Sequence, residues 1–142
     1  MEVSVLAVRR AAIGGFDTIP MGTPWNLVWA HSKNDHVLPR LPVSSQRHID
    51  LGHIVDPAKR SQLGGEDYPD SDKSHTLFCL AFFVKSNSLE YLLDPGSYQI
   101  DFQVFSATTR PSRVFTLHLN HTGEWFEDED RMYNEGLGLK IT

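Results

Sequence analysis

A strict alternation of apolar and polar residues is the feature of this sequence that most constrains its fold. In the stretch SYQIDFQVF, every second residue from Tyr98 to Val104 is apolar, and the residues between them are polar. Successive side chains of a β-strand point to opposite faces, so the pattern predicts a strand with one face in a core. The stretch RVFTLHLN repeats it, with Phe115, Leu117 and Leu119 inward. The two strands are expected to form an antiparallel hairpin with a loop of roughly five or six residues.

Turn signals and further strand candidates flank this hairpin. Pro95-Gly96 suits the two central positions of a type II turn, in which the glycine takes a positive φ. The stretches VSVLAVRR, NLVWAHS and RHIDLGHIV are typical of strands, and Gly52 in the last is expected to mark a bulge. The run from Leu77 to Val84 is apolar on both faces, which predicts a central strand covered on two sides. The stretch GEWFEDEDRMYNEG could hold one short helix, since its acidic residues favour a first turn.

Short strands separated by turn signals, with almost no helical pattern, predict an all-β fold. We expect an antiparallel β-sandwich of immunoglobulin-like or transthyretin-like type, with at most one short C-terminal helix. The chain has 142 residues, close to the ~150 of an average domain, so residues 1–142 are expected to form a single sandwich domain. Residues 56–75 are predicted to be a long mobile loop, because Gly64-Gly65 and scattered charges offer little to pack.

The charge balance argues against two classes of partner. The formal net charge is −5, so the chain has no basic field to attract nucleic acid or an anionic membrane surface. The longest apolar run, Thr76 to Val84, is far shorter than the ~20 residues of a spanning helix. The N-terminal MEVSVLAVRR has its basic pair after the apolar part, the reverse of a secretory signal. With one cysteine, which fits a reducing compartment, we expect a cytoplasmic chain that makes no membrane contact itself.

Histidine and cysteine do not form a recognisable reaction centre in this sequence. His118 and His121 are three positions apart, so on a strand they point to opposite faces, while His31 and His36 lie elsewhere. Zinc needs three or four converging ligands. Because the histidines are not expected to converge, surface or core positions are the better interpretation for them. Cys79 lies inside LFCLAFF, where apolar surroundings disfavour a reactive thiolate and favour core packing. No catalytic residue, metal ligand or cofactor is therefore predicted.

Two other sets of side chains could bind a ligand. The carboxylates of residues 127–130 are adjacent, but they lack the glycine-spaced loop of a calcium site, so a solvated acidic face is the better interpretation. Trp25, Trp29 and Trp125 could form an aromatic ligand platform. Against that stands the tendency of bulky aromatic residues in a sandwich to lie in the core or at its rim.

Three pieces of the chain, taken in order, resemble a β-rich domain found in bacterial proteins of unknown function. They are VSVLAVRR, then MGTPWNLVWAHS with SQRHIDLGHIVDP, and finally LDPGSYQIDFQVFSATTRPSRVFTLHLNHTGEWFEDEDRM. The shared end is a Pro-Gly and Tyr strand, a bend, a second strand, and a Gly-x-Trp followed by acids and a methionine. In this sequence the matching residues are Pro95, Gly96, Tyr98, Gly123, Trp125 and Met132. The resemblance implies an immunoglobulin-like or transthyretin-like sandwich and carries no catalytic motif.

Domains of this kind often follow membrane helices and begin with a strand ahead of the one that matches VSVLAVRR. The resemblance therefore implies that this sequence is either truncated or lacks a first strand that its relatives have. A truncated sequence could be the soluble part of a longer, membrane-associated protein. A sandwich without that strand has an open sheet edge near Val3–Val8. Unpaired backbone groups at an edge recruit another strand, so we expect self-association or pairing with a protein partner there.

Three functions are compatible with these expectations. The first is a non-enzymatic accessory or interaction module, because the polar residues on the readable strands are scattered singly and are not expected to converge. The second is a small-ligand or carbohydrate-binding domain that uses the tryptophans and the long loop. The third and least favoured is a metal-dependent hydrolase built on the histidines.

Overall fold

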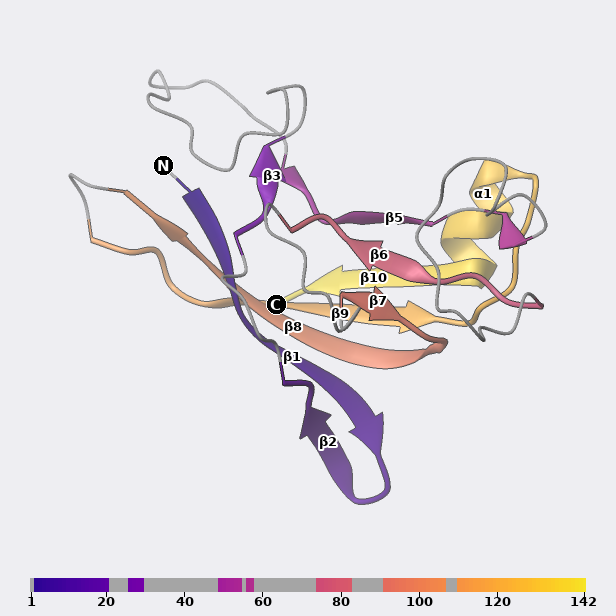
Figure 1. The fold of residues 1–142 in the computed structure, drawn as a ribbon, viewed down its shortest axis with the longest axis horizontal. Coiled ribbons are helices and arrows are strands. Elements are labelled where there is room, and N and C mark those ends of the chain that lie inside the picture. Colours follow the sequence, from indigo (N-terminus) through magenta and orange to yellow (C-terminus); the bar gives the residue numbers. More distant parts are fainter. Residues whose placement is uncertain are drawn as a thin grey trace.

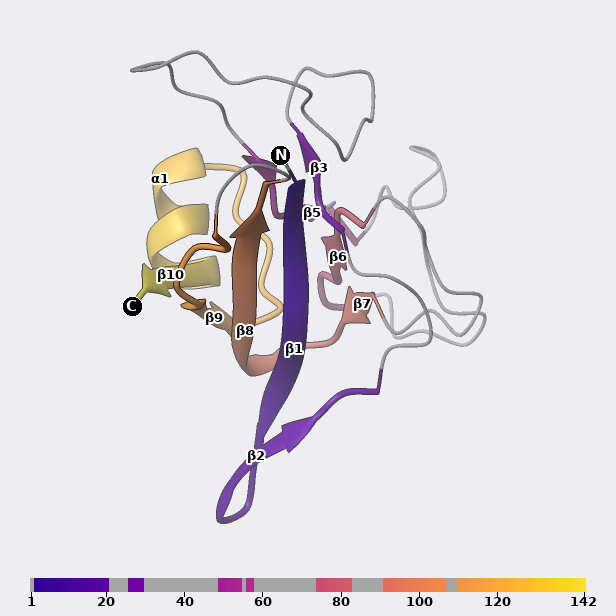
Figure 2. The same ribbon diagram turned by 90° about the vertical axis from the view of Figure 1, so that its left-hand side faces the viewer.

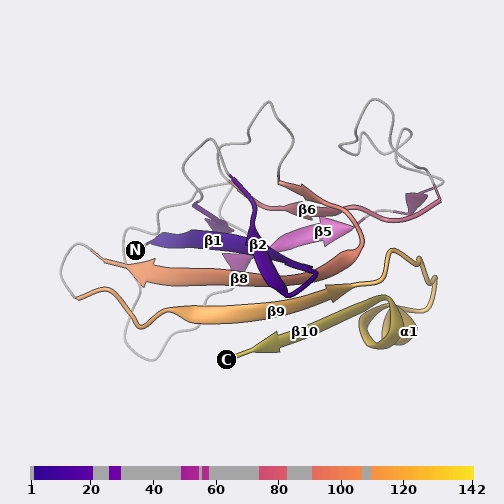
Figure 3. The ribbon, with the colours of Figure 1, turned by 90° about the horizontal axis from the view of Figure 1, so that it is seen from below.

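The larger of two layers is a five-stranded sheet in the order β10-β9-β8-β1-β2 (Figure 1). The computed structural model describes residues 2–20, 26–29, 49–54, 56–57, 74–82, 91–106 and 110–142. Within them the sheet consists of β1 (Glu2–Ala12), β2 (Gly15–Thr18), β8 (Gly96–Phe105), β9 (Phe115–His121) and β10 (Leu137–Ile141). Every pairing in it is antiparallel. Figure 3 shows β1, β8, β9 and β10 side by side, with β10 at the margin.

The second layer is smaller and is made of short strands. The strands β5 (Gly52–Ile54), β6 (Phe78–Leu80) and β7 (Leu92–Leu93) form an antiparallel sheet with β6 in its middle. The strand β3 (Val28–Trp29) pairs with β4 (Ile49–Asp50). Figure 2 shows β6 and β7 on one side of β1, and β9 and β10 on the other. The prediction of an all-β antiparallel sandwich is confirmed, whereas its immunoglobulin-like or transthyretin-like type stays a prediction.

The alternating stretch places its apolar face in the core, as predicted. Tyr98 and Ile100 of β8 are 2% and 0% exposed, and Leu117 and Leu119 of β9 are buried with them. The antiparallel hairpin of β8 and β9 is confirmed. Its connection, residues 106–114, is longer than expected. The reason is that Ser112 takes the place of a partner strand, with hydrogen bonds of 3.0 Å to both the amide and the carbonyl of Val104.

A β-bulge in β1 keeps the apolar residues of this strand on the core side. Val3, Val5 and Val8 are at most 3% exposed, although a strand of strict period two that buries Val5 would point Val8 the other way. The register against β8 shifts between Val5 and Ala7. The residue between them, Leu6, is 41% exposed. One extra residue in one strand therefore restores the apolar face.

The strand β6 is buried on both of its faces, as the apolar run predicts. Phe78, Cys79 and Leu80 are each at most 4% exposed. Gly52 does not mark a bulge within a strand, because the chain leaves β4 and enters β5 at this point, and Gly52 pairs with Leu80. A Cβ atom at Gly52 would lie 2.4 Å from the Cys79 carbonyl oxygen. Glycine is therefore required by the close approach of the two strands.

Two residues close one side of the sandwich by contacting both layers. Asn26 forms a bridge with Ser4 of β1, and Leu27 forms one with Phe82 after β6. The Leu27 amide also donates to the Val3 carbonyl at 2.9 Å, and the Leu27 side chain is 1% exposed. The strand predicted in NLVWAHS is confirmed for its first half, where β3 follows these two residues.

The expected type II turn at Pro95-Gly96 is wrong. Gly96 is the first residue of β8, pairs with His121, and does not have a positive φ. A positive φ occurs instead at Gly123, at +87°, in the loop after β9. A Cβ atom at Gly123 would lie 2.5 Å from Pro95 Cγ. Two residues of the resemblance, Pro95 and Gly123, therefore pack against each other.

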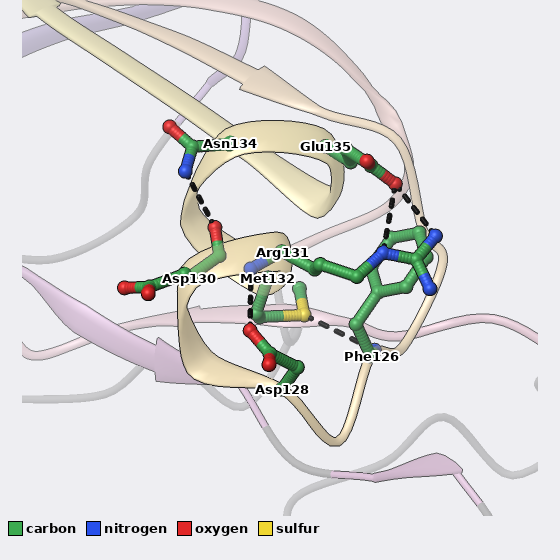
Figure 4. A network of polar contacts seen from close by, with 7 residues as sticks. All are labelled: Phe126, Asp128, Asp130, Arg131, Met132, Asn134 and Glu135. Atoms are coloured by element: carbon green, nitrogen blue, oxygen red, sulfur yellow. Dashed lines mark hydrogen bonds and ion pairs between the residues drawn. The ribbon is translucent and has the colours of Figure 1, made fainter.

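The stretch GEWFEDEDRMYNEG forms a short helical unit, α1 (Glu129–Arg131), continued by the π-helical turn η2 (Met132–Gly136). Asp128 caps it, with its carboxylate accepting from the Arg131 amide at 3.0 Å (Figure 4). The predicted short helix with an acidic first turn is confirmed. No helix in the described ranges has the length and apolarity to cross a membrane. Residues 58–73 of the predicted mobile loop lie outside the described residues.

Candidate functional site

The edge strand β10 exposes residues that belong to the core side of the sheet. Leu139 and Ile141 pair with Leu119 and Leu117 of β9, and residues directly opposite each other share a face. Leu117 and Leu119 are 4% and 1% exposed, whereas Leu139 and Ile141 are 48% and 60% exposed. The second layer therefore covers β9 and stops short of β10.

A groove of about 340 Å³ lies beside these residues. Its lining from the larger sheet is Phe102, Leu117, Leu139, Lys140 and Ile141, and Leu27 and Leu51 complete it. All of these residues except Lys140 are apolar, and the Lys140 side chain belongs to the outer face, because it alternates with Leu139 and Ile141 along β10. The groove is thus a continuation of the core that opens at the β10 side of the sandwich.

The backbone of β10 directs hydrogen-bonding groups away from the sheet. Thr142 and Thr116 exchange two N–H···O bonds, of 2.9 and 3.1 Å, and such pairs alternate with non-bonded pairs along an antiparallel ladder. Lys140 therefore points its backbone groups at β9, and Leu139 and Ile141 point theirs outward. In the described part of the chain, no strand pairs with that outer edge.

The open edge predicted near Val3–Val8 is partly covered: in the described residues β2 pairs with Arg9–Ala12 of β1 and not with Val3–Val8. Pairing with a partner at this edge stays a prediction. The strand β1 lies between β8 and β2. On the side away from β8, the Leu27 amide donates to the Val3 carbonyl, and the Ile19 amide donates to the Val8 carbonyl at 2.8 Å. The sequence alone does not show that the chain folds back along β1 in this way. In the order of the strands, the margins of the sheet are β10 and β2, and all four residues of β2 are exposed.

Polar side chains on the outer face of the larger sheet converge, contrary to expectation. Arg9 of β1 donates to both carboxylate oxygens of Asp101 at 2.7 and 2.9 Å, and Thr116 donates to Asp101 Oδ1 at 2.7 Å. The hydrogen bond from Arg9 lowers the pKa of Asp101, and the same bond raises the pKa of Arg9. The carboxylate is occupied by three donors, so this cluster ties three strands together. The expectation of scattered polar residues missed it because Arg9 and Asp101 are 92 residues apart in the sequence.

His121 is buried next to Thr76. The two residues are 1% and 0% exposed, and Thr76 Oγ1 lies 2.6 Å from His121 Nε2. The other ring nitrogen, Nδ1, has no hydrogen-bond partner among the described residues. Burial lowers the pKa of His121, and the charge of His75 adds to this, while the backbone and carboxylate of the nearby Asp94 act in the opposite direction. The imidazole is held neutral and enclosed, so solvent does not reach it in this conformation.

The structure separates the remaining candidates for chemistry. His118 pairs in register with Gln99 on the polar outer face, whereas His121 is buried, so the prediction that they point to opposite faces is confirmed. His31 and His36 lie outside the described residues. The described ranges contain no group of three or more His, Cys, Asp or Glu side chains that could hold a metal ion. Cys79 is 4% exposed, which confirms its packing in the core.

Of the three tryptophans expected to form a ligand platform, the structure places one side chain. Trp25 lies outside the described residues, and of Trp29 only its place in β3 is described. Trp125 is half-buried and lines a cavity of about 380 Å³. The joint platform therefore stays a prediction, and Trp125 has a site of its own.

This cavity lies between the second layer and the C-terminal helical unit, which Figure 1 shows next to each other. Four aromatic rings and three ionisable side chains belong to its lining: Phe78, Trp125, Phe126, Tyr133, His53, Glu127 and Glu129. The Trp125 indole N–H donates to Glu127 at 3.3 Å. The stretch GEWFE and the apolar run around Phe78 are visible in the sequence, but their meeting across the fold is not.

The helical unit fixes the wall of this cavity. The amide of Phe126 donates to the sulfur of Met132 at 3.5 Å, and the Arg131 guanidinium lies 4.4 Å from the centre of the Phe126 ring. Arg131 also donates to Glu135 at 2.8 Å (Figure 4). This hydrogen bond raises the pKa of Arg131. The carboxylates of residues 127–130 are exposed, as predicted for a solvated face.

The chain matches no family model, no curated protein and no solved structure. Its function is therefore inferred from the groove, the edge strand and the aromatic cavity described above.

Proposed function

We propose that this chain is a non-enzymatic interaction module that binds an extended segment of a partner protein by strand addition to β10. The observation that carries the proposal is the exposure of Leu139 and Ile141, 48% and 60%, on the face whose other residues form the core. An uncovered edge strand with unused backbone groups is a template for another strand. A segment added beside β10 would cover both side chains and use the outward N–H and C=O groups.

The groove gives the partner segment a definite chemistry. In a strand beside β10, every second side chain would point into the apolar groove next to Leu139 and Ile141. The side chains between them would lie on the outer face, where Lys140 pairs in register with His118. An acidic residue opposite Lys140 would add a cross-strand ion pair worth roughly 0.2–1 kcal/mol. The best partner is therefore an extended segment that alternates apolar and polar residues, with an acid at one polar position.

Selection of peptides from a random library displayed on phage tests this function. The selected peptides are expected to alternate apolar and polar residues and to bind Leu139→Pro at least ~10-fold more weakly than the unaltered chain, a loss of about 1.4 kcal/mol. Proline at position 139 removes an outward donor and leaves the bonds to β9 in place, which edge strands tolerate. The control variant Leu139→Val keeps both the donor and an apolar side chain, and should bind as the unaltered chain does.

Hydrogen exchange locates the bound peptide. The amides of Leu139 and Ile141 should become protected when the peptide is added, while those of β2 at the other margin should not change. Selected peptides without alternation, or peptides that bind Leu139→Pro as tightly as the unaltered chain, would contradict the proposal. If light scattering shows a dimer that Leu139→Pro dissociates, the added strand comes from a second copy of this chain and not from a partner protein.

A further inference from the structure

We infer that the cavity at Trp125 binds a small ligand that carries a quaternary or methylated ammonium group. This inference goes beyond strand addition at β10, since Leu139 and Ile141 do not line the cavity. The volume of about 380 Å³ is near the lower end of the ~300–1,000 Å³ typical of small-molecule sites. A compact ligand is therefore indicated.

The aromatic walls favour a cation. The faces of Trp, Tyr and Phe rings carry negative charge density, and a cation placed over such a face gains roughly 0.5–2 kcal/mol, more when water is excluded. Phe78, which is 4% exposed, lines the cavity from the second layer, and Trp125 and Tyr133 line it from the C-terminal part of the chain. Several aromatic rings lining one cavity favour an ammonium ion with methyl substituents, because each methyl group also packs against an apolar surface.

The charges around the cavity point the same way. Glu127 and Glu129 belong to the lining, and no Lys or Arg side chain does among the described residues. Two carboxylates attract a cation and repel an anion, whereas a neutral sugar has no net charge for them to attract. The third ionisable group of the lining is the exposed His53. The electrostatic field therefore selects a cation over a sugar or a phosphate.

A positively charged side chain of the protein itself, Arg131, is already held beside this cavity. The Arg131 guanidinium lies over the Phe126 ring and is bound to Glu135, so a positive charge is stabilised by an aromatic face and a carboxylate together (Figure 4). Phe126 also belongs to the cavity lining. The proposed ligand would make the same two kinds of contact inside the cavity, with Trp125 and Tyr133 as rings and Glu129 as the carboxylate.

Titration calorimetry with choline tests the inference directly. Choline is expected to bind with a single site, and its neutral carbon analogue 3,3-dimethylbutan-1-ol, which has the same shape, at least ~10-fold more weakly. Phosphocholine should also bind more weakly, because the carboxylates of Glu127 and Glu129 repel its phosphate. The same ammonium group also occurs in methylated proteins and in lipids, which a trimethyl-lysine peptide and phosphatidylcholine vesicles represent in the titration. Both should bind less tightly than choline, because a free small cation is the expected ligand.

Four variants assign the binding to this cavity. Trp125→Leu should weaken choline binding by ~10-fold or more, Trp125→Phe by less, and Glu129→Gln by several-fold. Asp130→Asn is the matched control, since Asp130 is an exposed neighbour in α1 that does not line the cavity. Thermal unfolding of each variant shows that it is folded, and Trp125→Phe keeps an aromatic ring in place should Trp125→Leu not fold.

Three results would overturn the inference: no saturable binding of choline, equal binding of the neutral analogue, or choline affinity unchanged in both Trp125→Phe and Glu129→Gln. A sugar that binds more tightly than choline in the same titration would overturn the choice of a cation. The strand-addition proposal is tested by Leu139→Pro, which does not alter the cavity lining, so the two proposals can fail separately.

Discussion

Burial of His121 links the stability of the fold to pH. The folded pKa is lowered from the ordinary value of 6.5, chiefly by burial. Between the folded pKa and 6.5, the unfolded chain therefore binds a proton that the folded chain does not. The contribution of neutral His121 to the free energy of unfolding should be complete above about pH 6.5. The free energy of unfolding should fall as the pH drops below that value, until the folded pKa is reached.

Urea unfolding at several pH values between 5 and 8 measures this effect. We expect the unaltered chain to lose stability below about pH 6.5, and His121→Gln to lose less over the same interval, because the buried titrating group is gone. His118→Gln removes a histidine from the outer face and is the matched control, which should follow the unaltered chain. A pH dependence that is the same in His121→Gln as in the unaltered chain would rule out His121 as its source.

At the scale of single residues, the sequence predicts which face of a strand a side chain lies on better than it predicts which residues that side chain contacts. The alternation around Ile100 and Leu119 places these residues in the core, and the apolar run places Cys79 there. The polar residues are different, because their partners come from other strands. The contacts of Arg9 with Asp101 and of Thr76 with His121 span 92 and 45 positions, and no local pattern in the sequence announces either one.

Among the elements, β5 and β10 set opposite requirements for glycine. A Cβ atom at Gly52 would lie 2.4 Å from a backbone oxygen of β6 and 2.5 Å from the Phe78 ring. At Gly138 in β10, the nearest atom would be Asn120 Cβ at 3.5 Å, an ordinary contact. The two positions therefore form a matched pair within strands.

Alanine at these two positions should have opposite effects. Gly52→Ala is expected to lower the free energy of unfolding by about 1–3 kcal/mol, because the backbone of β6 must move. Gly138→Ala should be neutral or stabilising by up to about 1 kcal/mol, since alanine loses less conformational freedom on folding than glycine does. Chemical denaturation of both variants checks this. Equal destabilisation by the two changes would mean that the approach of β5 to β6 is looser than described.

The elements show why some boundaries could not be predicted. The strands β8 and β9 and the capped helical unit carry strong local signals, and each was expected near its observed place. The bulge at Leu6 resets the alternation of β1, and it is visible only in the register against β8. The return of the chain at Gly15 along β1 buries none of the residues of β2, so no apolar pattern marks it.

For the molecule as a whole, the two sides of the sandwich are unequal. Asn26 and Leu27 connect the layers on the β1 side, whereas the core opens into the groove at β10. Among the described residues the layers differ in width: the larger sheet has five strands, and the second layer has a three-stranded sheet and a separate strand pair. The sequence predicts two layers but not their relative width, which depends on how the strands pair.

Native-state hydrogen exchange should show that the inner strands of the larger sheet are protected more strongly than its margins. The strand β8 has partners on both sides, so amides such as that of Ile100 are expected to exchange most slowly, at a rate that follows global unfolding. The amides of β2 and the outward amides of Leu139 and Ile141 should exchange fastest among the strands. Mass spectrometry of peptide fragments resolves the difference. Protection of β2 equal to that of β8 would contradict the pairing described for the larger sheet.

Cys79 can serve as a built-in probe of how often the fold opens. It is the single sulfhydryl in 142 residues, and it sits in the middle strand of the second layer with 4% of its surface exposed. An alkylating reagent can therefore modify Cys79 only when local or global unfolding exposes this strand. The rate of modification reports how often that happens, without any dye or engineered label.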